Sequence, residues 1–168
     1  MSMIYGFGPI ADSNSRVLIL GSMPSEASLA KGEYYGHPQN AFWRLISAIL
    51  EDPYDSDYEA RKAMLLRHHV ALWDVVAACE REGSSDAAIK MVTANDFAAF
   101  YAAHPLIRRV YFNGGKAFEL YKKHIGLSSH GISYDRLGST SPAHAVSFQR
   151  RLDDWKRLKE YIRGETLP

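Results

Sequence analysis

The stretch RVLILGSMPS, residues 16–25, decides the fold class of this chain. Its first half is a short, continuous apolar run that stops at Gly21, which is typical of a strand buried on both faces of a parallel sheet. Its second half is small and polar, as expected where a strand leaves the sheet. We therefore predict a strand over residues 16–20, followed by a polar loop over residues 22–39.

The remainder of the chain alternates between helical and strand patterns. Apolar residues recur at helical spacing over residues 41–50, with Asn40 in the N-cap position. We predict further helices over residues 59–68, 95–103, 116–124 and about 144–163, and further strands over residues 70–76, 109–112 and 133–137. This alternation predicts an α/β fold, a three-layer α/β/α sandwich with a central, mostly parallel four-stranded sheet, in a single domain over residues 1–168.

Composition excludes several classes of protein. The single cysteine, Cys79, rules out a disulfide framework, a four-cysteine zinc site and an all-cysteine iron–sulfur cluster within the chain. The seven histidines show no metal-ligand spacing, so we expect no metal and no cofactor. No segment reaches the roughly 18 apolar residues of a membrane span, and the N-terminus lacks the pattern of a signal peptide. We expect a cytoplasmic or nuclear monomer with no membrane partner.

The net charge of +1 hides an asymmetry along the chain. Residues 1–103 carry 8 basic and 13 acidic side chains, whereas residues 104–168 carry 12 basic and 6 acidic ones. A basic C-terminal part is compatible with a polyanionic partner, or it is only a solvated helix face. Charge alone does not separate these two interpretations.

Ligands of parallel sheets bind at the carboxyl ends of the strands, so the loops that begin at Gly21, Trp73, Asn113 and Gly138 are the ones to inspect. Gly21 allows a ligand to approach the backbone closely, and Pro24 fixes the turn. These loops predict where a site lies without identifying its ligand.

Side chains at three places near these loops have two interpretations each. A tyrosine of the pair Tyr34 and Tyr35 stacks on a planar ring, or both pack on the core. Asn40 offers a neutral amide that can orient water, or it only caps its helix. Asp74 accepts a hydrogen bond from a ligand N–H, or it caps the next turn.

Two further loops are candidates for phosphate contact. Residues 138–144, with three hydroxyls and His144, form either a phosphate-binding helix start or an ordinary cap. Residues 113–116 are either a phosphate contact or a plain turn, and they lack the spacing of an ATP or NAD loop. Ser22 follows a strand without the elbow motif of a serine hydrolase.

Taken together, residues 21–25, 34–44 and 139–143 resemble the uracil-DNA glycosylase superfamily, and within it the branch of hypoxanthine (deoxyinosine) and mismatch-specific uracil-DNA glycosylases. Residues 73–75 and 113–117 also fall where that family has its strand ends, so the resemblance spans nearly the whole chain. It implies a base-excision repair enzyme that flips out a deaminated base, hypoxanthine or uracil (for example in G/U mismatches), and hydrolyses its N-glycosidic bond.

The resemblance also implies roles for individual residues. Many family members have Asp or Asn where this chain has Met23, which can neither activate nor orient water. In the hypoxanthine branch the functional amide belongs to a His-Pro-x-Asn segment, so the resemblance gives the catalytic role to Asn40. One of Tyr34 and Tyr35, with Tyr35 favoured, would stack on the flipped base. The base pocket would contain Gly21, Ser22, Met23, Pro24, Tyr35, Asp74 and Asn113. The DNA backbone and minor groove would meet Gly115, Lys116, Ser139, Thr140, Ser141, Pro142 and His144.

From the charge asymmetry, we expect Lys116, Arg150, Arg151 and their neighbours to include a DNA-facing set. No lysine is placed for a lyase step, so we expect a monofunctional enzyme that uses water. Two alternatives stay open. One is a nucleic-acid or nucleotide-binding module on the same fold, with Met23 marking lost catalysis, and the other is a small-molecule hydrolase that uses Ser22.

Overall fold

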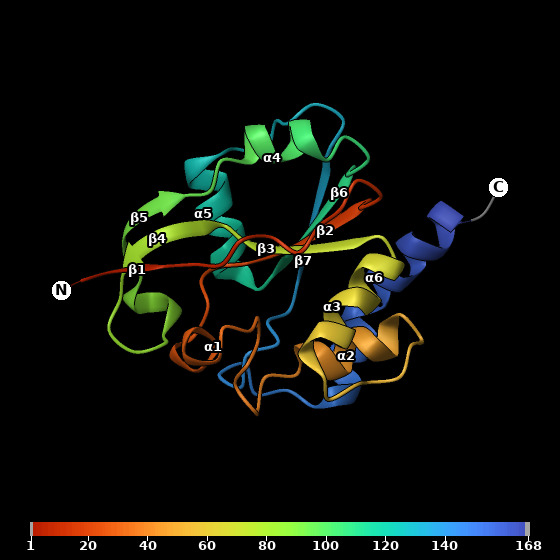
Figure 1. The fold of residues 1–168 in the computed structure, drawn as a ribbon, viewed down its shortest axis with the longest axis horizontal. Coiled ribbons are helices and arrows are strands. Elements are labelled where there is room, and N and C mark those ends of the chain that lie inside the picture. The colour runs from red at the N-terminus through yellow and green to blue at the C-terminus, as the bar shows by residue number, and fades with distance from the viewer. Residues whose placement is uncertain (1, 167–168) are drawn as a thin grey trace.

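The computed structural model describes residues 2–166 and contains a four-stranded parallel sheet (Figure 1). Its strands are β2 (Val17–Gly21), β3 (Val70–Asp74), β6 (Arg109–Asn113) and β7 (Ser133–Leu137), in the order β3-β2-β6-β7. All three pairings are parallel, which confirms the predicted central sheet. Every residue of β2 and β3 is buried, because helices cover the sheet on both faces.

The helices form one layer on each side of this sheet, as predicted (Figure 1). One layer contains α2 (Phe42–Ile49), α3 (Tyr58–Arg67) and α6 (Phe148–Thr166), and the other contains α4 (Phe97–Ala103) and α5 (Gly115–His124). Phe42 of α2 meets Trp155 of α6 edge to face, with ring centroids 6.1 Å apart. Aromatic contacts of this kind anchor the helices to the core. No helix within residues 2–166 has the length and apolar character needed to cross a membrane.

A second, antiparallel sheet lies beside the first and was not predicted. It consists of β1 (Met3–Tyr5), β4 (Val76–Glu80) and β5 (Lys90–Ala94), in the order β1-β4-β5. The predicted strand over residues 70–76 was therefore wrong in extent, because β3 ends at Asp74 and the chain passes into β4. Val75 and Val76 are as buried as β3, so the apolar run carries no sign of the change of sheet.

One helix was not predicted, and another begins later than predicted. The polar loop over residues 22–39 contains α1 (Glu26–Lys31), which begins because the Ser25 hydroxyl accepts a hydrogen bond from the Ser28 N–H. The last helix begins at Phe148 rather than near His144. Before it, the His144 N–H donates to the Ser141 carbonyl and closes a turn, and the Ser147 hydroxyl accepts from the Arg150 N–H.

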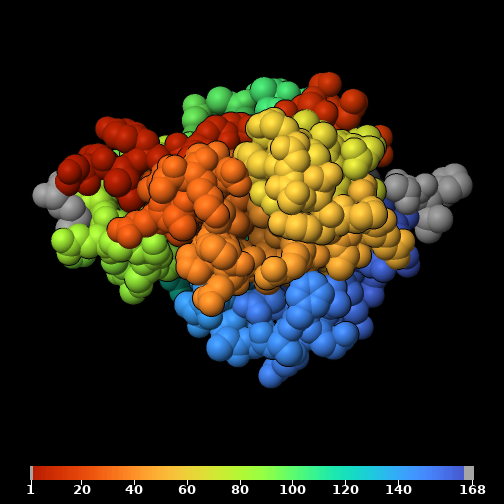
Figure 2. Space-filling view, turned by 60° about the horizontal axis from the view of Figure 1, so that its bottom comes forward, coloured from red at the N-terminus to blue at the C-terminus, as the bar shows by residue number. Residues whose placement is uncertain are grey.

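The strand order places a crevice next to β2. The chain runs from β2 to β3 on one side and then to β6 on the other, so the loops that follow β2 and β6 diverge. Figure 2 shows the orange residues that follow β2 lying directly against the blue segment that follows β7, with the green β4–β5 hairpin on the other flank. Segments far apart in the sequence thus meet at one edge of the sheet.

Candidate active site

A cavity of about 620 Å³ opens where the carboxyl ends of β2, β3 and β6 meet. The structure brings the whole predicted base pocket to this cavity, namely Gly21, Ser22, Met23, Pro24, Tyr35, Asp74 and Asn113. Asn40 also lines it, as do Ser139, Thr140, Ser141, Pro142 and His144. We call Gly21, Tyr35 and Asp74 the cavity floor, and residues 138–147 the rim loop.

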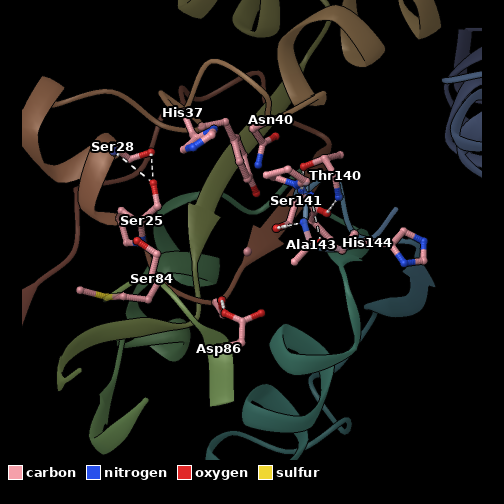
Figure 3. Close-up of a pocket in the computed structure, with 18 of the residues that line it drawn as sticks. Ser25, Ser28, His37, Asn40, Ser84, Asp86, Thr140, Ser141, Ala143 and His144 are labelled. Atoms are coloured by element: carbon pink, nitrogen blue, oxygen red, sulfur yellow. Dashed lines mark hydrogen bonds between the residues drawn. The ribbon is translucent and has the colours of Figure 1, made fainter. Parts of the chain in front are cut away.

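Asn40 both supports a helix and faces the cavity. Its Oδ1 accepts a hydrogen bond from the Phe42 N–H at 2.9 Å, although the N-cap residue of α2 is Ala41. This bond fixes the side chain and uses one lone pair of Oδ1, which leaves the amide nitrogen and the second lone pair of the oxygen for the cavity. Figure 3 shows the Asn40 side chain directed into the space enclosed by the labelled residues. The two interpretations of Asn40 from the sequence are therefore compatible.

The two tyrosines differ in their surroundings. Tyr34 is only 3% exposed, its hydroxyl donates to the Gly8 carbonyl at 2.6 Å, and its carbonyl accepts from the Trp43 indole N–H at 2.7 Å. Tyr34 therefore serves mainly the core. Tyr35 has a positive φ of 53° and stacks on Phe42 with ring centroids 4.3 Å apart. Few bulky residues adopt this backbone region, and here it turns Tyr35 toward the cavity floor.

The cavity floor contains two buried polar groups without partners. Within residues 2–166, neither Asp74 Oδ2 nor the Tyr35 hydroxyl has a hydrogen-bond partner. Both side chains lie against the backbone of Gly21. A Cβ at this position would lie 2.5 Å from Asp74 Oδ1 and 2.8 Å from the Tyr35 hydroxyl. Only glycine fits there without displacing one of these groups.

Burial controls the ionisation of both groups. It raises the pKa of Asp74 to about 7, the negative charge of Asp86 acts in the same direction, and the positive charge of Arg81 opposes them. Burial also raises the pKa of Tyr35 well above its usual value, the Asp74 charge adds to the effect, and the nearby Asn113 side-chain amide opposes them. Near neutral pH the floor therefore holds a neutral hydroxyl and a carboxyl group close to half ionisation.

Asn113 serves the rim loop more than the open cavity. Its Nδ2 donates to Thr140 Oγ1 and its Oδ1 accepts from the Thr140 N–H, both at 3.0 Å. The Thr140 carbonyl accepts in turn from the Ala41 N–H at 3.1 Å. These bonds fasten the rim loop to the end of β6 and to the start of α2, with Asn40 directly beside them.

Of the basic residues expected to include a DNA-facing set, Arg151 does not face the solvent. Its side chain is buried, and its guanidinium donates to the carbonyls of Ser141, His144 and Val146 at 2.7–2.9 Å. The arginine thus closes the rim loop from inside. Arg150 is exposed, and Lys116 is half-buried at the start of α5.

The other residues predicted to meet DNA lie at or near the rim. Gly115 is exposed at the first position of α5, and among the described residues neither it nor Lys116 belongs to the cavity lining. The His144 ring points away from the cavity centre (Figure 3). The Ser139 and Ser141 hydroxyls accept from the N–H groups of Ser141 and Ala143, so they shape the turn.

Sequence reasoning missed one wall of the cavity. The β4–β5 hairpin contributes Ser84, Ser85, Asp86 and Ala87, and Ser25, Ser28 and His37 also join the lining. Asp86 Oδ1 accepts from the Ser22 hydroxyl at 2.7 Å, and Arg81 donates to the Pro24 carbonyl at 2.7 Å. These contacts pair segments about 60 positions apart, which no local pattern indicates. Within residues 2–166, no group of three or more His, Cys, Asp or Glu side chains is placed to hold a metal ion.

Comparisons with known proteins agree along nearly the whole chain. The model of the uracil DNA glycosylase superfamily matches residues 7–162. The hypoxanthine DNA glycosylase of Methanosarcina barkeri (strain Fusaro / DSM 804) is 40% identical over 154 residues, which cover 86% of this chain and 98% of that protein. The hypoxanthine DNA glycosylase of Methanosarcina acetivorans is 39% identical over 156 residues, covering 91% and 96%.

A solved structure shares the fold as well. It is the solution NMR structure of a Methanosarcina acetivorans protein described as a candidate uracil DNA glycosylase. The superposition has a TM-score of 0.83 at 34% sequence identity and covers 96% of this chain and 99% of that one. The likeness therefore extends through both helix layers and the rim loop.

Proposed function

The chain belongs to the uracil DNA glycosylase superfamily, and we propose that this DNA glycosylase hydrolyses the N-glycosidic bond of a deaminated base, with hypoxanthine as its main substrate and uracil as a second one. Two relatives about 40% identical to this chain are hypoxanthine DNA glycosylases, which supports this choice of base. The observation that carries the mechanism is the amide of Asn40, held at the cavity wall by its bond to Phe42.

The cavity suits a base that has left the double helix. An enzyme can reach the glycosidic bond only after extruding the nucleotide, which costs a few kcal/mol and least for a mispaired base. A volume of about 620 Å³ accommodates a purine or a pyrimidine. The stacked pair of Tyr35 and Phe42 forms an aromatic wall at this cavity, against which we expect the flat base to pack.

Asn40 would position the nucleophile. The reaction passes through an oxocarbenium-like state in which negative charge grows on the departing base, so ordered dipoles matter more than a strong base. The Asn40 amide nitrogen donates a hydrogen bond and can hold a water oxygen beside C1′. Met23 is buried and apolar, so it cannot take over this role. Backbone N–H groups of the loop after β2 would stabilise the charge on the base.

DNA would approach across the rim loop. Lys116 and Arg150 are the basic side chains near this edge that remain available to phosphates, because Arg151 is occupied with carbonyl groups. Contacts between such side chains and phosphates weaken as salt concentration rises. We therefore expect the affinity for duplex DNA to fall with salt.

The experiment is an excision assay on duplexes that carry deoxyinosine or deoxyuridine opposite each normal base. Abasic sites should form from both, faster from deoxyinosine, and strands should break only after alkali treatment. Asn40→Ala should slow excision by about 100-fold or more, the usual cost of losing one positioned donor. Gln39→Ala is the matched control, because its exposed side chain lies next in sequence but outside the cavity lining. If Asn40→Ala excises at the rate of the wild type, Asn40 does not position the water.

A further inference from the structure

The cavity has an electrostatic character that the proposed function does not explain. Among the described residues, its lining contains two carboxyl groups, those of Asp74 and Asp86, and no lysine or arginine. Negative charge repels the phosphates of DNA, so these groups oppose the binding of the substrate. A group of this kind helps an enzyme only where it binds the transition state better than it binds the substrate. The reason for the negative charge should therefore lie in the reaction.

We propose that Asp86 stabilises the positive charge that develops on the sugar while the glycosidic bond breaks. The inference rests on the proposed function and adds a second group to its reaction, in which Asn40 would hold the water. The C1′–N bond breaks with its electron pair leaving on the base, the water oxygen bonds to C1′, and one water proton ends on the base. Between these events the sugar is oxocarbenium-like, so a carboxylate beside it lowers the barrier and is itself unchanged at the end.

Asp86 lies on a side wall of the cavity rather than on its floor. It begins the single 3₁₀ turn η1 (Asp86–Ala88) of the β4–β5 hairpin, and its Oδ1 accepts from the Ser22 hydroxyl at 2.7 Å. Figure 3 shows Asp86 and Asn40 on opposite sides of the space that the labelled residues enclose. With the base on the floor, the sugar lies between these two walls. The carboxylate and the water would therefore act on the sugar from different sides.

The hairpin that carries Asp86 is fixed before any substrate enters. Besides the bond to Ser22, the Ser84 hydroxyl accepts from the Glu26 N–H at 2.9 Å. The buried guanidinium of Arg81 donates to the Pro24 carbonyl at 2.7 Å. These contacts fasten the hairpin at three places to the segment that follows β2. A charge that is already in place needs no rearrangement when the sugar becomes positive, which makes its stabilising effect larger.

The two carboxyl groups of the cavity differ in their suitability for this task. Asp74 is 4% exposed at the floor, below the expected position of the sugar, and burial raises its pKa to about 7. The next cause of that rise is the negative charge of Asp86, so this charge already acts inside the cavity. Asp86 is exposed, and the Ser22 hydroxyl that it binds is neutral and does not cancel its charge. Asp86 is therefore the carboxyl group placed to act on the sugar.

The test compares the wild type with Asp86→Asn, which keeps the shape and removes the charge. Two duplexes carry abasic-site analogues that differ in charge, a neutral tetrahydrofuran and a pyrrolidine whose ring nitrogen is protonated. The wild type should prefer the pyrrolidine duplex, and Asp86→Asn should lose about tenfold or more of this preference. Excision of hypoxanthine in a single turnover should slow by a similar factor. The affinity for an uncleavable duplex with 2′-fluoro-deoxyinosine should stay equal or rise, because a repulsive charge is removed.

The control variants separate the charge from its surroundings. Glu82→Gln removes a negative charge from an exposed residue of the same hairpin, outside the cavity lining, and should leave the preference and the excision rate unchanged. Asp86→Glu keeps the charge on a longer side chain and should retain part of the preference, whereas Asp86→Ala should lose it. Because residue 86 is exposed, we expect the melting temperatures of these variants to match that of the wild type.

Two results would overturn the inference. An unchanged preference in Asp86→Asn would mean that the carboxylate does not act on the sugar. An equal loss of affinity for both analogues would mean that Asp86 only shapes the wall through its bond to Ser22. A wild type that excises neither base would overturn the proposed function instead, and the preference between the two analogues would still decide whether Asp86 acts at the position of the sugar.

Discussion

The cavity floor and the rim loop use polar groups in opposite ways. On the floor, the Tyr35 hydroxyl and Asp74 Oδ2 are buried without partners among residues 2–166. In the rim loop, Thr140 is bound through its side chain, its N–H and its carbonyl, and Arg151 of α6 bonds three of the loop's carbonyls through Nη1 and Nη2, although its Nε has no partner within residues 2–166. A satisfied network rigidifies a segment, whereas unsatisfied groups reduce stability until a ligand completes them. We therefore expect substitutions in the two regions to change the free energy of unfolding with opposite signs.

The largest effect is expected at Asp74. Its pKa is about 7 in the folded protein, against an ordinary value near 3.8, so the folded state holds this proton more tightly than the unfolded state. The free energy of unfolding therefore falls as pH rises from about 4 to 7, and the loss is complete above pH 7. Asp74→Asn removes this penalty and should stabilise the protein at pH 8 by a few kcal/mol, but hardly at pH 4. Urea unfolding at both pH values measures it, and a variant less stable than the wild type at pH 8 would contradict the comparison.

The next effect has the opposite sign and concerns Arg151. Arg151→Met keeps much of the buried stem but removes three bonds to carbonyls of the rim loop. Because bonds from a charged donor are among the stronger ones, we expect a loss of about 2–3 kcal/mol and weaker binding of duplex DNA. Arg150→Met is the matched control, since this neighbouring side chain is exposed and should affect only DNA binding. Equal stability of the two variants would show that Arg151 does not hold the rim loop.

The contrast between Arg150 and Arg151 also shows what the sequence can reveal. Both are basic residues of one helix, and charge counting could not say which of them belongs to the DNA-facing set. The partners of Arg151 are backbone carbonyls, whose positions depend on a turn that no residue pattern indicates. The central sheet, in contrast, was predictable because the apolar run over residues 16–20 and the alternation of elements are local signals.

The same distinction between local signals and contacts with distant segments explains which parts of the site were predictable. Strand ends of a parallel sheet must meet at one edge, so Gly21, Asp74 and Asn113 could be placed together from the sequence. The second sheet was missed because β1 is three residues long and pairs with residues 78–80, far along the chain. The hairpin wall with Asp86 follows from that sheet, so it was missed as well.

A smaller loss is expected from Thr140→Val. The change keeps the shape and both backbone bonds of Thr140 but leaves the Asn113 Nδ2 buried without an acceptor. An unsatisfied buried donor costs about 1–3 kcal/mol, and we expect the lower half of this range because one of three links is removed. Chemical denaturation measures the loss. Thr93→Val, the same change at an exposed residue of β5, is the control, and an unchanged stability of Thr140→Val would mean that the rim loop does not depend on this pair.

The smallest effect is expected at Tyr35, and its sign is the sharpest test of the comparison. Tyr35→Phe preserves the ring stacked on Phe42 and removes only the buried, unpartnered hydroxyl. Deleting a group that is desolvated without a bond relieves a cost, so the free energy of unfolding should stay equal or rise by up to about 1 kcal/mol. Excision should change by only a few fold if Tyr35 acts through its ring, since the aromatic wall remains.

Thr140→Val and Tyr35→Phe each delete one side-chain oxygen from the same cavity, so opposite signs in one denaturation experiment would support the division into a strained floor and a satisfied rim. A destabilised Tyr35→Phe would mean that the hydroxyl has a partner in solution and that the floor is as satisfied as the rim.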